Sequence, residues 1–225
     1  MSLPANHPRL AKRPYSQGEL VADGVVHGLA IVAGVIAFPV LFARIVAQGA
    51  TGDGIALGVY AATFFLMFGF SLAYNMTPPS SLKWLLRRFD HTAIYLMIAG
   101  TYTALLVRLE DRFWAWTLIS TVWVGALGGS LVKLAFPGRW DRLSIALYLL
   151  LGWVVVVAIG PMIASLPAAT MILVAVGGGL YSLGVVFYKW HALKFQNAIW
   201  HGFVAVAAGC HWAGIALAMG SATGA

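Results

Sequence analysis

The sequence predicts an all-α fold, a bundle of seven transmembrane helices whose N-terminus is cytoplasmic and whose C-terminus lies outside. Three observations lead to this prediction. The chain of 225 residues is 61% hydrophobic and only 9% charged, whereas soluble domains carry roughly 25% charged residues. Its charges divide it into apolar blocks of spanning length, and its Lys and Arg residues gather at alternate block ends.

The uncharged blocks set the number of spans, because a spanning helix needs about 20 apolar residues. The blocks hold 20, 29, 17, 20, 46 and 31 residues. The 46-residue block is too long for one helix, and the segment GPMIASLP (160–167) supplies Gly and Pro residues that divide it. The expected helices are 24–47, 54–76, 91–108, 113–135, 142–160, 167–188 and 196–218.

The positive charges predict the orientation. With the N-terminus inside, the cytoplasmic segments hold eleven Lys and Arg residues and the outer segments hold three. This bias follows the positive-inside rule. Residues 1–18 then form a basic cytoplasmic segment, and residues 19–225 form a single membrane domain. Because the basic residues lie at span ends, the net charge of +7 indicates membrane topology, and we expect a lipid partner and no nucleic acid.

Polar side chains inside the spans are the candidates for function, since ionisable groups there are rare and costly. Glu19, Asp23 and His27 follow one another at intervals of four residues and therefore line one face of the first helix. Asn197 and His201 are one turn apart at the start of the last helix. Both sets are expected near the cytoplasmic side.

Two further pairs are expected at the same depth. Ser71 and Asn75 lie one turn apart near the end of the second helix, and Asp90 with His91 opens the third. A helical bundle can build a site from such facing side chains. Each group also has a structural interpretation: Asp90 as an N-cap, Ser71 bonded within its own helix, and His201 as an interhelical hydrogen bond.

The remaining histidines and the cysteine are expected to be structural. His211 is ten residues beyond His201, about 15 Å deeper along the helix, and we expect a core histidine bonded to a carbonyl. Cys210 is expected to be a small packing residue. His7 and His191 lie in polar flanks and are expected to be solvated.

Four segments carry a resemblance to a known family. They are ELVADGVVHG (19–28), SLAYN (71–75), RRFDHTAIYLMIAGTYT (87–103) and NAIWHGFV (197–204). In this order they resemble the hemolysin III family, the bacterial branch of the progestin and adipoQ receptors. The resemblance implies seven helices with a cytoplasmic N-terminus, a place in the bacterial inner membrane, and kinship with membrane hydrolases related to alkaline ceramidases.

The resemblance also implies a zinc site. In the family, zinc is bound by the histidine of a Ser-x-x-x-His motif and by both histidines of a His-x-x-x-His motif, and an Asp holds the zinc-bound water. The matching positions here are Ser71, Asn75, Asp90, Asn197 and His201. Two ligand positions therefore hold asparagine, whose neutral amide is a poor zinc ligand.

Two arrangements follow from this departure. A metal is held by His201 and His27 with acids from Asp23, Glu19 or Asp90, or the cluster is a metal-free hydrogen-bond network, to which Asn side chains are suited as donors and acceptors.

Three functions are consistent with the sequence. The first is a hydrolase of a lipid amide or ester in which a water held by zinc or polarised near His201 attacks the carbonyl, Asp90 is the base, and Ser71 with Asn75 stabilises the oxyanion. The second is a non-enzymatic sensor or regulator of membrane lipid, and the third is a proton carrier. In the first two, the polar cluster binds lipid head groups, or in the sensor an ion, and its expected binding residues are Glu19, Asp23, His27, Asn75 and Asn197. Cytolysis enters only as an inherited family label.

Overall fold

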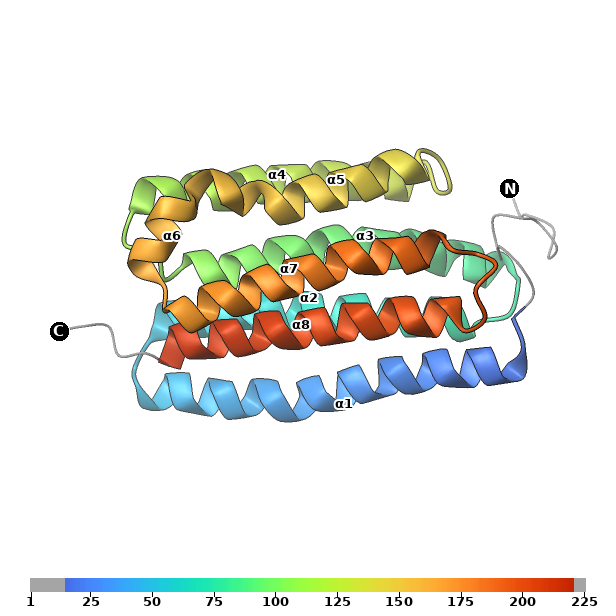
Figure 1. Cartoon of the computed structure of the whole chain (residues 1–225), viewed down its shortest axis with the longest axis horizontal. Coiled ribbons are helices and arrows are strands. Elements are labelled where there is room, and N and C mark those ends of the chain that lie inside the picture. Colours follow the sequence, from blue (N-terminus) through green and yellow to red (C-terminus); the bar gives the residue numbers. More distant parts are fainter. Residues whose placement is uncertain (1–14, 221–225) are drawn as a thin grey trace.

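The computed structural model describes residues 15–220, and every regular element in this range is helical. The elements are α1 Gln17–Ala47, α2 Thr51–Met76, α3 Ser81–Leu106, α4 Arg112–Ala135, α5 Asp141–Trp153, the 3-10 helix η1 Val154–Ala158, α6 Ile159–Ser165, α7 Ala168–Lys189 and α8 Gln196–Gly220. They form seven rods that run side by side (Figure 1), since α5, η1 and α6 together make one.

Six of these rods are long and apolar enough to cross a membrane, and α3 is the seventh. The helix α3 is less apolar because it carries Asp90, His91 and several Thr and Tyr residues. It packs against α2 and α4 along its length and also meets α5 and α8, so that other helices cover much of its surface. The predicted all-α, seven-helix fold is confirmed, and the orientation of its ends stays a prediction.

The starts of α1, α3, α5 and α8 and the ends of α2, α4 and α7 lie at the same end of the bundle (Figure 1). Large apolar side chains such as Val35, Val124 and Ile172 are exposed along the rods. This apolar exterior is the surface that lipid chains would cover. The chain is a multi-pass membrane protein by length and composition of its helices.

The third helix begins ten residues before the expected start. The Ser80 side chain accepts a hydrogen bond from Lys83 N at 3.2 Å and caps α3, and Pro78 and Pro79 precede it. Asp90 therefore lies in the third turn of α3, so the interpretation of Asp90 as an N-cap is wrong. Asp90 bounds the apolar block of 17 residues on which the expected start rests, but a helix can begin before its apolar block begins.

The fifth span also differs from the expectation, because it reaches Ser165 and not residue 160. Its break falls at η1, within the run Val154–Val157. Here the Tyr102 hydroxyl is inserted into the backbone hydrogen bonding of the helix. It donates to Gly152 O at 2.9 Å and accepts from Val155 N at 2.9 Å. An inserted side chain and the missing N–H of Pro161 are both recognised causes of a helix break.

Lys83 fixes the end of α2 that carries part of the polar cluster. Its ammonium donates to Tyr74 O and to Thr77 O, each at 2.8 Å. These carbonyls lie in the last turn of the helix and at its C-cap, where backbone acceptors lack helical partners and a positive charge is favourable. Met76 lies beside α1, where its sulfur is close to Gly24.

Candidate functional site

The polar face of α1 is buried as a unit. Glu19, Asp23 and His27 are 5%, 2% and 0% exposed, which agrees with the expected spacing on one helix face. His27 Nδ1 lies 2.8 Å from Asp23 O, so the ring donates from Nδ1 to the carbonyl one turn earlier. The residues Asp23 and His27 thus enter the bundle interior at the end where α1 begins.

Glu19 joins the start of α1 to the start of α8. Its Oε2 accepts from Ser16 N and from Ser16 Oγ, each at 3.0 Å, and Ser16 Oγ in turn accepts from Glu19 N. This is a capping box. Its Oε1 accepts from Phe195 N at 2.9 Å, immediately before α8. These bonds favour a structural role for Glu19.

The polar end of α2 presents Ser71 and Asn75 to the same interior. Asn75 Nδ2 donates to Ser71 O at 2.9 Å and lies 3.3 Å from Ser71 Oγ. Ser71 is buried and Asn75 is half-buried. The Ser71 hydroxyl also lies 3.4 Å from His201 Nε2, and therefore faces α8 as well as its own helix.

His201 is the centre of the cluster. Its Nδ1 lies 2.5 Å from Asp23 Oδ1, while its Nε2 faces Ser71. Its ring is 4.3 Å from the His27 ring between centroids, at an interplanar angle of 61°. With 9% of its surface exposed, this imidazole is held between an acid from α1 and a hydroxyl from α2.

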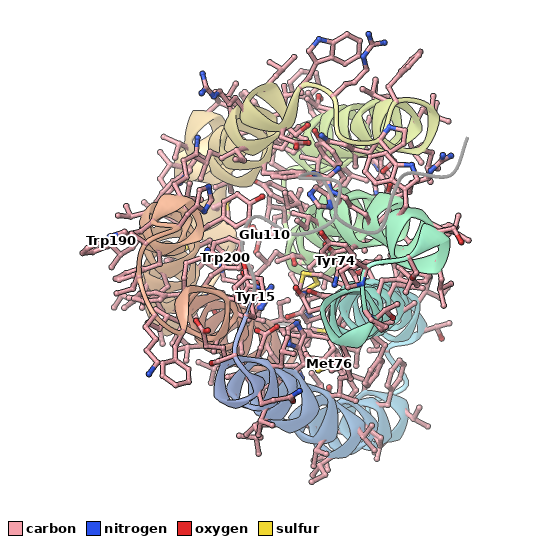
Figure 2. The ribbon with its side chains drawn as sticks, turned by 90° about the vertical axis from the view of Figure 1, so that its right-hand side faces the viewer. Tyr15, Tyr74, Met76, Glu110, Trp190 and Trp200 are labelled. Atoms are coloured by element: carbon pink, nitrogen blue, oxygen red, sulfur yellow. The ribbon has the colours of Figure 1, made fainter. Side chains whose placement is uncertain are left out.

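The two asparagines at the zinc-ligand positions bond to each other. Asn197 Nδ2 donates to Asn75 Oδ1 at 3.1 Å, and the Tyr15 hydroxyl donates to Asn197 Oδ1 at 3.4 Å. Tyr15 lies between the start of α1 and the other helices in the view along the bundle (Figure 2). A neutral pair of amides thus connects α2 to α8 at the mouth of the cluster.

Asp90 completes the set from α3. Its carboxylate lies close enough to Ser71 and His201 to interact with both, and its Oδ2 is 3.3 Å from His91 Nδ1. Four helices, α1, α2, α3 and α8, therefore bring the expected residues together, as the polar spacing predicts. His91 turns mainly to its own helix, since its Nδ1 also lies 3.0 Å from Arg87 O.

A buried group that could hold a metal is present, but its members differ from the family pattern. Ligand atoms of Asp23, His27 and His201 lie within 4.8 Å of one another. Asp23 Oδ2 and His27 Nε2 are buried without a hydrogen-bond partner among residues 15–220. The positions implied by the resemblance do not fit zinc, because the amides of Asn75 and Asn197 are poor ligands that bond to each other.

The site has a neighbouring ion-pair network that sequence reasoning missed. Asp141 Oδ1 lies 2.8 Å from Lys133 Nζ and its Oδ2 lies 2.8 Å from Arg87 Nη2. One carboxylate thus ties α3, α4 and α5 together at the end of the bundle that holds the cluster. The available signal was an acid at the edge of a segment with several basic residues.

The other polar groups lie where the sequence placed them. His211 Nε2 is 3.2 Å from Val174 O, so the expected core histidine bonded to a carbonyl is confirmed. Its ring borders an apolar cavity between α3, the broken fifth span, α7 and α8, away from the cluster. Cys210 is half-buried and reduced, and His191 is exposed. His7 lies outside the described residues.

Fold and site together define a multi-pass helical membrane protein with a buried His, Asp and Ser cluster at one end of its bundle. A profile of the family described as Haemolysin-III related matches residues 19–212. The chain belongs to this family, which confirms the resemblance seen in the sequence.

Individual relatives agree with this assignment. The chain is 35% identical over 187 residues to Hemolysin-3 of Bacillus cereus, covering 83% of this chain and 85% of that protein. It is 34% identical over 186 residues to a Hemolysin-3 homolog of Bacillus subtilis strain 168, covering 83% and 87%. It is also 31% identical over 124 residues to the monocyte to macrophage differentiation factor of Homo sapiens, covering 55% and 51%.

Proposed function

We propose that this chain is a membrane hydrolase that cleaves an ester or amide bond of a membrane lipid at the cluster formed by α1, α2, α3 and α8. One observation carries the proposal: a buried imidazole, His201, lies between the carboxylate of Asp23 and the hydroxyl of Ser71. An oriented imidazole beside a hydroxyl is the arrangement that general-base catalysis of acyl transfer requires.

Each residue has a role in this chemistry. His201 accepts the proton of the attacking oxygen through Nε2 and later returns it to the leaving group. Asp23 holds the ring through Nδ1 and stabilises the imidazolium that forms. The Asn75 amide, 3.3 Å from Ser71 Oγ, donates to the oxyanion. Asp90 borders the same hydroxyl and is the second candidate base.

The zinc implied by the family does not enter this mechanism. Asn75 and Asn197 occupy two of its three ligand positions and bond to each other, and His201 uses both ring nitrogens within the cluster. A metal would instead have to be held by Asp23, His27 and His201, whose spacing permits it. The side chains present at the family's ligand positions therefore do not fit zinc, and the roles given above need no metal.

The substrate class follows from where the cluster lies. The exterior of the rods is apolar, and the cluster lies inside one end of the bundle, next to the ion pairs of Asp141. A lipid whose chains lie along the rods would bring its head group and first ester or amide to this level. With the predicted orientation in a bacterial inner membrane, this level is the cytoplasmic side.

The test is hydrolysis in a defined membrane. Protein purified without a histidine tag is placed in nanodiscs with fluorescent lipid esters and lipid amides, and release of the fatty acid is measured. His201→Gln should reduce hydrolysis by roughly 10²–10⁴-fold, while His211→Gln, the control on the same helix, should retain it. Equal rates for His201→Gln and the unaltered protein would overturn the proposal.

A second candidate is the non-enzymatic lipid sensor, and one observation favours it. A continuous chain of polar contacts runs from Tyr15 through Asn197, Asn75, Ser71 and His201 to Asp23. Such a network links α1, α2 and α8 and can respond to a head group by rearranging. If the unaltered protein hydrolyses none of the lipids but changes its proteolysis pattern with lipid head group, the sensor replaces the hydrolase.

A further inference from the structure

We propose that Ser71 is the nucleophile of this site and forms a covalent acyl-enzyme, with His201 as its base and Asp23 as the residue that positions the base. This inference rests on the proposed hydrolase and adds a particular reaction path to it. The family pattern assigns its serine beside a metal, whereas the contacts here connect Ser71 to an imidazole and that imidazole to a carboxylate.

The connections follow the order of a Ser-His-Asp triad. In that arrangement the Nε2 atom of the histidine faces the serine hydroxyl and the Nδ1 atom donates to the acid. Here His201 Nε2 is 3.4 Å from Ser71 Oγ and Nδ1 is 2.5 Å from Asp23 Oδ1. Contacts between nucleophile and base are often long without substrate, so 3.4 Å fits a resting state.

The proton positions are consistent with this order. Asp23 is an acceptor when ionised, so it favours the tautomer of His201 that carries its proton on Nδ1. The Nε2 lone pair is then free to accept the proton of the Ser71 hydroxyl. Asn75 Nδ2 donates toward Ser71 Oγ at 3.3 Å, so the hydroxyl hydrogen is directed to His201 or to the Asp90 carboxylate, which also interacts with Ser71.

Ser71 differs from four other helix hydroxyls of this bundle, which bond within their own helices. Thr101, Thr103, Ser144 and Ser182 each donate to the carbonyl four residues earlier, at distances of 2.8, 2.8, 3.1 and 2.8 Å. That bond within a helix is the ordinary structural use of such a side chain. The Ser71 hydroxyl faces His201 and Asn75 instead, which points to a chemical role.

The reaction balances without a metal or a redox partner. Ser71 Oγ forms a bond to the carbonyl carbon, and its proton passes to His201 Nε2. The oxyanion accepts a hydrogen bond from Asn75 and collapses, and the C–O or C–N bond of the lipid breaks as the leaving group takes the proton from His201. Water then attacks the acyl-Ser71 ester, loses its proton to His201, and Ser71 recovers its proton as the fatty acid departs.

In the alternative reaction path, Asp90 is the base. Its carboxylate also interacts electrostatically with Ser71 and His201, and as a base it would activate water directly and leave Ser71 unmodified. The two paths differ in whether a covalent bond to Ser71 ever forms.

The experiment uses the full chain in nanodiscs of phosphatidylethanolamine and phosphatidylglycerol. A fluorophosphonate with a long alkyl chain is added, and intact mass and peptide mapping locate the adduct formed when Ser71 Oγ displaces fluoride from phosphorus. We expect one adduct, on Ser71, at a rate that an added chelator leaves unchanged. His201→Gln should slow labelling roughly 10²–10⁴-fold, Ser71→Ala should abolish it, and Ser182→Ala is the matched control that should retain it.

A second measurement needs no variant. The unaltered protein is quenched in acid during turnover of the lipid substrate, and its intact mass should show one acyl group on Ser71. Lipid hydrolysis without any adduct on Ser71 would overturn the nucleophile and leave the hydrolase standing with Asp90 or a metal as activator. An adduct on Ser71 with no hydrolysis of ester or amide lipids would instead overturn the proposed function on which the inference rests.

Discussion

His201 and His211 lie on the same helix, α8, and differ in what surrounds them. His201 is held between Asp23 and Ser71 beside a second imidazole. His211 bonds to Val174 O and otherwise borders an apolar cavity. The difference shows that a histidine inside a membrane bundle gains chemical capacity from an acid and a hydroxyl on other helices, whereas His211 has one carbonyl partner and a buried Nδ1 with no hydrogen bond among the described residues.

The largest expected effect is the loss of catalytic rate on substitution of Asp23. Asp23→Asn keeps the size of the side chain but removes the charge that orients His201, so kcat should fall by roughly 10²–10⁴-fold with KM little changed. Steady-state hydrolysis in nanodiscs measures both constants. Asp53→Asn is the control, because Asp53 pairs with Arg108 at 3.0 Å at the opposite end of the bundle. A rise in KM alone would assign Asp23 to substrate binding.

A second prediction concerns zinc binding, which we expect to appear when histidines replace the two asparagines beside His201. Asn75→His combined with Asn197→His restores imidazoles at positions that bond to each other beside His201. Three imidazoles can hold zinc in a tetrahedral site, so the double variant purified without a tag should carry about one zinc per chain. Elemental analysis should find much less in the unaltered protein. No gain in the double variant would show that these three side chains do not converge.

A smaller effect is expected at the His211 end of α8. Gly177 allows α7 to approach His211, and an added Cβ would meet the His211 ring and lie 3.1 Å from Ala207 O. Gly177→Ala should therefore lower the free energy of unfolding by about 1–3 kcal/mol, seen as a lower midpoint of thermal denaturation in detergent. Gly202→Ala is the matched control, since its added Cβ meets nothing within 4 Å and should stabilise α8 by up to about 1 kcal/mol. Equal shifts in both variants would contradict the close approach.

The smallest effect is expected from His211 itself. His211→Leu removes one hydrogen bond to Val174 O and keeps an apolar side chain at the cavity, so it should cost about 0.5–1.5 kcal/mol of stability. Labelling of Ser71 by the fluorophosphonate should be unchanged. A loss of labelling in this variant, with its midpoint of denaturation preserved, would mean that the two histidines are coupled.

Much of the site was predictable because helical spacing is a local property. The intervals between Glu19, Asp23 and His27, and between Asn197 and His201, place each set on one face whatever the tertiary structure. The start of α3 was not predictable from the apolar block, since Ser80 and the charged turn that follows extend the helix beyond it. The break of the fifth span depends on the Tyr102 hydroxyl from α3, and a partner from another helix leaves no signal in the segment that it alters.

The sequence by itself determined the number of rods, the helix faces that carry the polar residues and the departure from the zinc pattern at Asn75 and Asn197, because these follow from composition and from spacing along one chain. Only the tertiary structure decided that His201 turns Nδ1 to Asp23 and Nε2 to Ser71, while Glu19 is engaged by Ser16 and Phe195. Those contacts depend on the rotation and shift of α1, α2 and α8 against one another, which are set by side-chain packing between helices.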